Sequence, residues 1–397
     1  MTQTDLVVIG AGVTGSAIAR DAAMRGIRTT VIESGQVGAG TSGRFHSMLQ
    51  SGSRYVVTDT VYAAECMRER LVMERIAPFA RTATEGLFVA FDEEDLAFAE
   101  RFAAAGEEAE IPVNWLDPAQ IAAREPALSA TKGGFVVPDA VFRPWELVPA
   151  IAASAMAHGA EFLTGTTVTE IVTGPDGLTG VRVRTEEGQE RLIESAALVI
   201  AAGAWAADLG AQAGLKIEVE TAKGAMLVVP GERVNSVVNR LRPPQSFDIA
   251  VPLNGSTVFG TTSSIVDSAA DVAVTPEEFT ELSEEFLAFL PGAVDEDRSK
   301  WTAYAGVRPL VSAAPGEGGA VSRKHAVFSG SVANVFGVVG GSFTTHRAMA
   351  EDVVDRVARN LDVGAESRTA YEQLAPAPDV AWSAASPMQS NGIGLST

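Results

Sequence analysis

The chain has 397 residues, of which 46% are hydrophobic, so it can bury a large core, and its length predicts two domains. Its net charge of −20 disfavours nucleic acid or an anionic membrane as a partner, and an anionic substrate would need a local arginine cluster. The single cysteine, Cys66, excludes an internal disulfide and a cysteine-ligated iron–sulfur cluster, and no apolar run reaches the roughly 18 residues of a transmembrane helix.

The chain begins with the pattern of a nucleotide-binding unit. Residues 6–9 form a short apolar run, typical of a buried parallel strand, and a G-x-G-x-x-G turn follows it directly. In such a turn Gly10 permits the tight bend, Gly12 lets a pyrophosphate approach the backbone, and Gly15 lets the next helix press against the strand. We therefore expect a dinucleotide at this turn.

The second strand of this unit delivers an acid and then a polar loop. Residues 28–32 form this strand, and Glu33 follows it at the place where an acid can bond both ribose hydroxyls. The acid disfavours a 2′-phosphorylated nucleotide, because two negative groups would meet there. Residues 35–44 are rich in glycine and hydroxyl groups, which suits a second hold on a pyrophosphate, with Arg44 adding charge. A flexible surface loop is the alternative interpretation of this segment.

Residues 59–79 read as a long amphipathic helix. Cys66 lies within it and is interpreted as a packing residue. Its expected apolar side consists of Val61, Ala64, Leu71, Val72 and Ile76.

The pattern changes at residue 86, where short strands and helices predict an inserted cap. Alternating strands from residue 161 to 193 predict a half-exposed sheet, and the continuous apolar run 197–200 marks the return to the buried parallel one. Residues 216–262 alternate strands and loops, and residues 276–290 read as a helix. The fold class is thus α/β.

Two later strands end in small residues, at Ala202-Gly203 and at Gly340-Gly341. A chain that returns three times to one sheet suits an extended cofactor buried along its length, as FAD is. The expected fold is a Rossmann-like FAD-binding domain of the glutathione-reductase type, interleaved with an α+β substrate domain on a largely antiparallel sheet. Its expected bounds are 1–85, 140–215 and 325–375 for the FAD-binding domain, 86–139 and 216–324 for the substrate or cap domain, and 376–397 for a flexible tail.

Several stretches together resemble the D-amino-acid oxidase superfamily of flavoproteins, and within it the FAD-dependent glycerol-3-phosphate dehydrogenases, above all the catalytic subunit of the anaerobic type. The resemblance extends to about residue 362. The matching stretches are ARDAAMRG, GAGTSGRFHSMLQSGSRYVVTD, EGLFVAF, GGFVVPDAVFRPWEL, AAGAWAADL, AKGAML, AYAGVRPLV and VVGGSFTTHRAMAEDV.

The resemblance implies a set of site residues. Arg54 and Arg308 would face the anionic end of the substrate, with Gln50, Tyr55, Ser342 and His346 beside them. The residues that would hold FAD are Gly10, Gly12, Gly15, Glu33, Thr41, Ser42, Gly43, Arg44, Val168, Ala202, Gly203, Gly340, Gly341, Phe343 and Thr344.

This chain departs from the dehydrogenases at the expected reaction centre. Gln50 stands where they have a catalytic histidine, Ser342 where they have a lysine, and His346 where they have a tyrosine. Glutamine cannot act as a base, and serine cannot supply a positive charge to a phosphate. The cysteine-bearing C-terminal domain of the anaerobic enzyme is also not expected here.

Oxidation of an alcohol by a flavin passes hydride from the carbinol carbon to flavin N5 while a base accepts the hydroxyl proton. Arg54 and Arg308 form the expected clamp, because guanidinium grips carboxylate or phosphate through two hydrogen bonds. The catalytic residues are expected to be Arg308 with His346 or His46 as the base. Lys223 either lines the pocket or is an ordinary lysine at a strand end.

The first function hypothesis is an FAD-dependent dehydrogenase or oxidase that converts C–OH to C=O in a small anion, a glycerol-3-phosphate-like polyol phosphate or a 2-hydroxy acid. An amine or amino-acid oxidase of the same fold is the second hypothesis, and a flavin-binding subunit without turnover is the third.

The electron acceptor stays open between oxygen, a quinone and a partner protein. The first strand begins too close to Met1 for a signal peptide, so we expect a cytoplasmic protein, and peripheral membrane association stays open.

Overall fold

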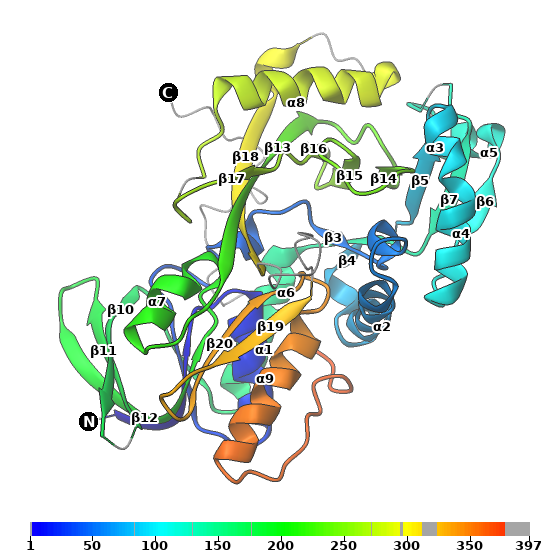
Figure 1. Ribbon diagram of the computed structural model, residues 1–397. Coiled ribbons are helices and arrows are strands. Elements are labelled where there is room, and N and C mark those ends of the chain that lie inside the picture. Colours follow the sequence, from blue (N-terminus) through cyan, green and yellow to red (C-terminus); the bar gives the residue numbers. More distant parts are fainter. Residues whose placement is uncertain are drawn as a thin grey trace.

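The computed structural model describes residues 2–82, 84–128, 130–175, 177–270, 272–293, 297–311 and 324–377. Figure 1 shows two sheet-based regions, one below and one above, which the chain visits in turn. Of the tail predicted for 376–397, residues 378–397 lie outside the described residues. Among the helices that are described, none combines the length and the apolar character needed to cross a bilayer.

The lower sheet is built around parallel strands. Strand β1 (Thr2–Ile9) lies between β2 (Thr29–Ile32) and β12 (Glu190–Ile200), and β12 also pairs in parallel with β20 (Val335–Gly340). Antiparallel strands extend this sheet beyond β12 and β20. These antiparallel strands are β10 (Thr166–Gly174), β11 (Gly177–Thr185) and β19 (His325–Ser329), whereas β9 (Glu161–Leu163) pairs in parallel with β2 at the opposite edge.

Strand β1 is apolar at consecutive positions because both of its faces are covered. Leu6 and Val8 belong to the core cluster of helices α1 (Val13–Met24), α6 (Pro144–Ala157) and α9 (His346–Asn360). Val7 and Ile9 belong to the opposite cluster, which includes residues of β11 and of helix α7 (Ala206–Gln212). A strand buried on both faces reads as a continuous apolar run rather than an alternating one.

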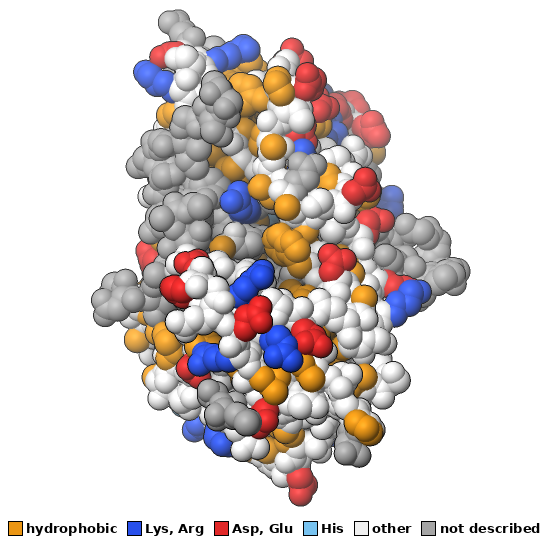
Figure 2. All heavy atoms as spheres, turned by 90° about the vertical axis from the view of Figure 1, so that its left-hand side faces the viewer, with side chains coloured by type: hydrophobic (Ala, Val, Ile, Leu, Met, Phe, Trp, Pro, Cys, Tyr) orange, Lys and Arg blue, Asp and Glu red, His pale blue; other side chains and the backbone are white. Residues whose placement is uncertain are grey.

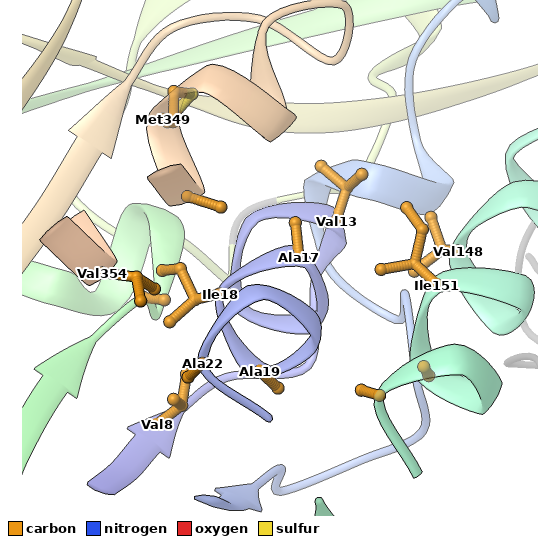
Figure 3. Packing of buried hydrophobic residues seen from close by; sticks show 14 of the residues in the cluster. Val8, Val13, Ala17, Ile18, Ala19, Ala22, Val148, Ile151, Met349 and Val354 are labelled. Carbon is orange, nitrogen blue, oxygen red and sulfur yellow. The ribbon is translucent and has the colours of Figure 1, made fainter. Parts of the chain in front are cut away.

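Helix α1 packs between its two neighbours through small side chains. Figure 3 shows Ala17 and Ile18 of α1 between α6, which presents Val148 and Ile151, and α9, which presents Met349 and Val354. Alanine allows the helix axes to approach closely, so α1 is held against the sheet with its first turn at the end of β1.

The upper sheet is mostly antiparallel. Its strand order is β17-β13-β16-β15-β14-β5-β7-β6, with β18 on the other side of β13, and the pair β14 and β5 is parallel. Helix α8 (Pro276–Phe289) covers it (Figure 1), with Phe286 packed against Phe259 and Trp301. Its strands are β5 (Gly86–Ala90), β6 (Asn114–Leu116), β7 (Gly133–Val137), β13 (Val219–Pro230), β14 (Val237–Arg240), β15 (Ile249–Leu253), β16 (Ser256–Gly260), β17 (Ser264–Ile265) and β18 (Thr302–Val311).

Further short elements join the two regions. A small sheet of β3 (Met48–Leu49), β8 (Ala140–Phe142) and β4 (Arg81–Thr82) lies beside helix α2 (Thr60–Ile76) in Figure 1. The cap adds helices α3 (Glu93–Ala97), α4 (Ala99–Glu108) and α5 (Pro118–Arg124). The predicted domain bounds stay a prediction.

The predicted apolar side of α2 is confirmed at Ile76, which is buried, and wrong at two positions. Val61 and Leu71 are exposed, whereas Glu69 and Arg70 are buried together with Cys66. Glu69 can be buried because Arg347 of α9 forms an ion pair with it at 2.6 Å. A paired charge avoids most of the penalty of burial, and hydropathy alone does not detect such a pair.

On the face shown in Figure 2, Lys and Arg side chains lie among Asp and Glu rather than in a basic block of their own. With the net charge of −20, this distribution is unlike the concentrated basic surface of nucleic-acid-binding proteins.

Candidate functional site

A cavity of about 660 Å³ lies where the carboxyl ends of β1, β2, β12 and β20 meet β18. In open α/β sheets, ligands bind at this edge of the parallel strands. The cavity is lined by the turn after β1, by Glu33, and by Arg54 and Arg308. It is therefore a site to which both regions of the molecule contribute.

The turn after β1 needs its glycines for steric reasons. Gly10 has φ +104°, and a Cβ there would lie 2.7 Å from the carbonyl oxygen of Ala201. A Cβ on Gly15 would collide with the carbonyl oxygen of Gly10. Gly15 thus allows α1 to press against the turn and does not itself line the cavity, whereas Gly10 and Gly12 do.

The loop 35–44 folds back onto this turn. Ser42 Oγ accepts a hydrogen bond of 2.9 Å from the backbone N–H of Val13, and Thr41 Oγ1 donates to the carbonyl of Val307 at 2.6 Å. Ser42 and Thr41 line the cavity. The loop is thereby anchored at the first turn of α1 and at β18, which favours the ligand-holding interpretation over a flexible surface loop.

Gly43 and Arg44 are placed differently from the expectation. Neither lines the cavity, although both belong to the same loop. The backbone of Arg44 lies against Gly306 of β18, where a Cβ would collide with the Arg44 carbonyl oxygen. Burial lowers the pKa of Arg44. Arg44 therefore serves the contact with β18, and the expectation that Gly43 and Arg44 line the cofactor cavity is corrected.

Glu33 lies at the end of β2 with both carboxylate oxygens held by backbone N–H groups. Oε2 accepts from Ala11 and Oε1 from Gly35, each at 2.8 Å. The carboxylate also lines the cavity. It is oriented before any ligand arrives, as the bonding of a ribose requires.

The glycines after β20 also line the cavity. Gly340 has φ +82° and Gly341 has φ +68°, and both adjoin atoms that a side chain would hit: the Lys324 carbonyl at 2.6 Å from a Cβ on Gly340, and Met349 sulfur at Gly341. The other predicted cofactor residues of the later chain also line the cavity: Val168, Ala202, Gly203, Phe343 and Thr344.

Two arginines reach the cavity from different elements. Arg54 lies in the short helix Ser53–Tyr55, and its Nη2 donates to the carbonyl of Gln245 at 2.8 Å. Arg308 lies on β18, and its Nη2 donates to Thr261 Oγ1. Gly224 on the neighbouring strand β13 leaves the room for this guanidinium, because a Cβ there would collide with it.

The other predicted substrate residues, Gln50, Tyr55 and Ser342, also line the cavity. Gln50 is 6% exposed, its backbone N–H donates to Thr344 Oγ1 at 3.2 Å, and its Nε2 donates to Cys66 Sγ at 3.7 Å. Burial raises the pKa of the Cys66 thiol to about 12, so it stays protonated and behaves as a packing residue.

His346 is not where the sequence predicted it. It is 2% exposed, does not line the cavity, and its Nδ1–H donates to the Phe343 carbonyl at 2.6 Å. Burial lowers its pKa to about 4, and the neighbouring cations Arg347 and Arg20 act in the same direction. We therefore correct the expectation that His346 faces the substrate: it is a buried, neutral residue at the start of α9.

His46 does line the cavity. Its Nδ1 accepts a hydrogen bond of 3.3 Å from the backbone N–H of Met48. A neutral ring that accepts at Nδ1 carries its proton on Nε2, so in this arrangement His46 is a donor. Its assignment as the base stays a prediction.

Several residues of the site were not predicted. Thr166, Trp205 and Asp208 line the cavity. Trp205 and Asp208 closely follow Ala202-Gly203, so proximity to a predicted turn was the available signal. Lys223 does not line the cavity, because its Nζ is bound to Glu278 at 3.0 Å on the side of α8.

Residues 5–356 match the model of a protein family described as FAD dependent oxidoreductase. The chain is 37% identical over 368 residues to the A subunit of anaerobic glycerol-3-phosphate dehydrogenase from Escherichia coli strain K12, which covers 90% of this chain and 67% of that protein. It is 36% identical over 398 residues to the A1 subunit of anaerobic glycerol-3-phosphate dehydrogenase from Haloferax volcanii. This match covers 94% of this chain and 67% of that protein. The chain thus spans about two thirds of the length of these relatives.

Solved structures share the fold. Glycerol-3-phosphate dehydrogenase from Bacillus halodurans, complexed with FAD, superposes with a TM-score of 0.71 at 25% identity, covering 94% of this chain and 68% of that one. L-α-glycerophosphate oxidase from Mycoplasma pneumoniae, with FAD bound, has a TM-score of 0.74 at 19% identity, and the match covers 96% of this chain and 98% of that one. Glycine oxidase from Geobacillus kaustophilus has a TM-score of 0.71 at 23% identity over 90% and 95%.

The cavity fits the cofactor that this family carries, FAD. Gly10 and Gly12 expose backbone at the first turn of α1, where N–H groups attract phosphate, and Glu33 is held ready for a ribose. Gly203 has no atom within 4 Å of an added Cβ, so the backbone there is open to a flat ligand. FAD would be held by the residues of the turn, the loop and the two later glycine pairs.

Proposed function

The chain belongs to the family of FAD dependent oxidoreductases, and we propose that it oxidises the secondary alcohol of a small anion, a polyol phosphate of the glycerol 3-phosphate kind. The observation that carries this proposal is a single cavity with a nucleotide-type turn and acid at one end and two arginines in its wall. A 2-hydroxy acid is the other anionic alcohol that such a clamp suits.

Bound FAD supplies the acceptor for the hydride that leaves the carbinol carbon. The protein binds and orients the substrate: Arg54 and Arg308 would hold its anionic group, because guanidinium forms paired charge-assisted hydrogen bonds with phosphate and carboxylate. Gln50 and Ser342 offer neutral hydrogen-bonding groups beside them, which suits hydroxyls of the substrate.

The fate of the hydroxyl proton follows from the histidines. His346 is buried away from the cavity, and His46 holds its proton on Nε2 while Nδ1 accepts from Met48. We therefore assign to His46 the role of a hydrogen-bond donor toward the substrate oxygen, and the proton leaves to solvent. A neutral amine substrate would also need no base in the protein. The amine or amino-acid oxidase hypothesis is therefore tested in the same experiment.

The test is anaerobic mixing of the flavin-loaded protein with candidate substrates, followed by flavin absorbance. Glycerol 3-phosphate should bleach the flavin, and glycerol, which lacks the phosphate, should fail at the same concentration. Bleaching by 2-hydroxyglutarate alone would assign a 2-hydroxy acid. Bleaching by sarcosine or D-alanine alone would assign the amine or amino-acid oxidase activity, and no bleaching by any of them would favour the flavin-binding protein without turnover.

The electron acceptor is a separate question. We propose a quinone or a partner protein over oxygen, because the relatives at 36–37% identity are dehydrogenase subunits, whereas the oxidases resemble the chain in fold alone. After reduction under exclusion of oxygen, the rates of reoxidation by air and by a short-chain quinone are compared. Faster reoxidation by air would identify an oxidase.

We further propose that the protein works in the cytoplasm, with peripheral membrane contact if a quinone is the acceptor.

A further inference from the structure

The two arginines of the cavity are held by different kinds of partner. Arg308 donates to a threonine hydroxyl, Thr261 Oγ1, and more distantly to the Thr262 carbonyl at 3.4 Å. Arg54 instead contacts a carboxylate: its Nη2 lies 3.4 Å from Asp248 Oδ2, in addition to its bond to the Gln245 carbonyl. The remaining nitrogens of Arg54, Nε and Nη1, form no hydrogen bond with a described residue, so they are available to the cavity that Arg54 lines.

Asp248 is fully buried and does not line the cavity. Its Oδ1 accepts from Arg242 Nε at 2.8 Å, and its Oδ2 accepts the backbone N–H of Gln245 at 2.7 Å. One carboxylate thus closes the connection between β14 and β15 and at the same time fixes one nitrogen of Arg54. A buried charge with this many donors is held in one orientation.

We propose that Asp248 is a positioning residue for the substrate clamp. It and the Gln245 carbonyl bind Nη2 of Arg54 and so fix the plane of the guanidinium, which leaves the N–H donors of Nη1 in one orientation toward the anionic group of the substrate. This inference rests on the proposed function for the identity of the substrate, but the contact geometry applies to any anion bound at Arg54.

Asp248→Asn separates positioning from mere packing, because it keeps the shape and removes one acceptor. The amide NH₂ would face either Arg242 or the donors of Gln245 and Arg54, and none of these can accept. Arg54 would then lose its fixed orientation, although the site would gain net positive charge.

The matched control is Asp95→Asn. Asp95 is also buried and accepts from Arg240 Nε at 2.9 Å, two residues from Arg242, but its partners among the described residues do not include Arg54.

The experiment measures three quantities on flavin-loaded wild type, D248N, D95N, R54A and the double variant R54A/D248N. They are the Kd for inorganic phosphate by calorimetry, the KM and kcat with glycerol 3-phosphate, and the midpoint of thermal unfolding. We expect D248N to raise Kd and KM about tenfold, a loss of about 1.4 kcal/mol of binding, with kcat lowered less than about threefold. D95N should lower the thermal midpoint and leave Kd and KM unchanged. R54A/D248N should bind no more weakly than R54A, because Asp248 acts through Arg54.

Unchanged or lower Kd and KM in D248N would overturn the proposal, as would additive effects in the double variant. If D248N does not fold, Asp248→Glu replaces it: a shifted carboxylate should raise Kd at an unchanged thermal midpoint, and an unchanged Kd would reject the positioning role. If glycerol 3-phosphate fails to reduce the wild type, the proposed function fails, and the phosphate Kd still decides the role of Asp248.

Discussion

The two ends of the cavity are built in different ways. The cofactor end consists of backbone: the turn Gly10 to Gly15, the glycines at 340 and 341, and a carboxylate, Glu33, held by N–H groups of nearby residues. The substrate end consists of side chains from remote elements, with Arg54 fixed by residue 248 and Arg308 fixed by residue 261. Backbone geometry leaves little choice of residue, whereas a side-chain clamp can be rebuilt by exchanging single residues. Gln50 and Ser342, the positions at which this chain departs from the dehydrogenases it resembles, lie at the side-chain end.

The largest effect is expected from Gly15→Ala at the cofactor end. A Cβ there would collide with the carbonyl oxygen of Gly10, which cannot move without displacing the turn. We expect the variant to lose FAD binding and about 3 kcal/mol or more of its free energy of unfolding. Flavin content after purification and urea unfolding measure these changes.

The matched control is Gly106→Ala in α4. A Cβ on Gly106 meets both γ-methyls of Val113, at 2.7 and 2.9 Å, so this variant also strains the packing, but Gly106 does not line the cavity. This variant should retain FAD. If Gly15→Ala retained FAD as well, the backbone-built end would tolerate side chains that its geometry is expected to reject.

The next effect is expected at the substrate end from Arg308→Ala. Loss of paired charge-assisted hydrogen bonds should raise the KM about a hundredfold with FAD still bound, because each such bond contributes about 1.5–3 kcal/mol. Gly224→Ala tests the same position without changing the arginine, since its Cβ would displace the guanidinium, and should raise the KM about tenfold. Steady-state kinetics and flavin content are the measurements, and an unchanged KM in both variants would remove Arg308 from the clamp.

The smallest effect concerns His346, which the sequence assigned to the substrate end and the structure places outside the cavity. Its pKa of about 4 lies below the usual value of 6.5, so the unfolded chain binds more protons between these values. Its contribution to stability is therefore present above pH 6.5 and is lost as the pH falls toward 4. Between pH 7 and pH 5 this amounts to about 2 kcal/mol.

His346→Gln should remove that part of the pH dependence, measured as the free energy of unfolding in urea at pH 7 and pH 5. The same variant should reduce its flavin within about threefold of the wild-type rate, because residue 346 does not reach the cavity. A large fall in the rate of flavin reduction, in a variant of normal stability, would return His346 to the substrate end.

Much of the fold followed from local patterns. Strand β1, its glycine turn and Glu33 were predicted because each is specified within one short segment, and the upper sheet was predicted from the succession of strands and loops in residues 216–262. The failures concern residues whose surroundings come from elsewhere in the chain. Val61 and Leu71 were taken for core although they are exposed, and the predicted side did not include Glu69, which is buried because Arg347, 278 positions away, pairs with it.

The sequence by itself determined the family, the FAD-binding unit and the candidate arginines, because these depend on residue types at fixed local spacing. Tertiary structure alone decided that His346 is buried behind Phe343, that Arg44 packs on β18 rather than facing the cavity, and that Asp248 lies against Arg54. Arg54 and Asp248 are 194 positions apart. Their contact joins the short helix Ser53–Tyr55 to the connection between β14 and β15, and no local pattern specifies which side chains meet there.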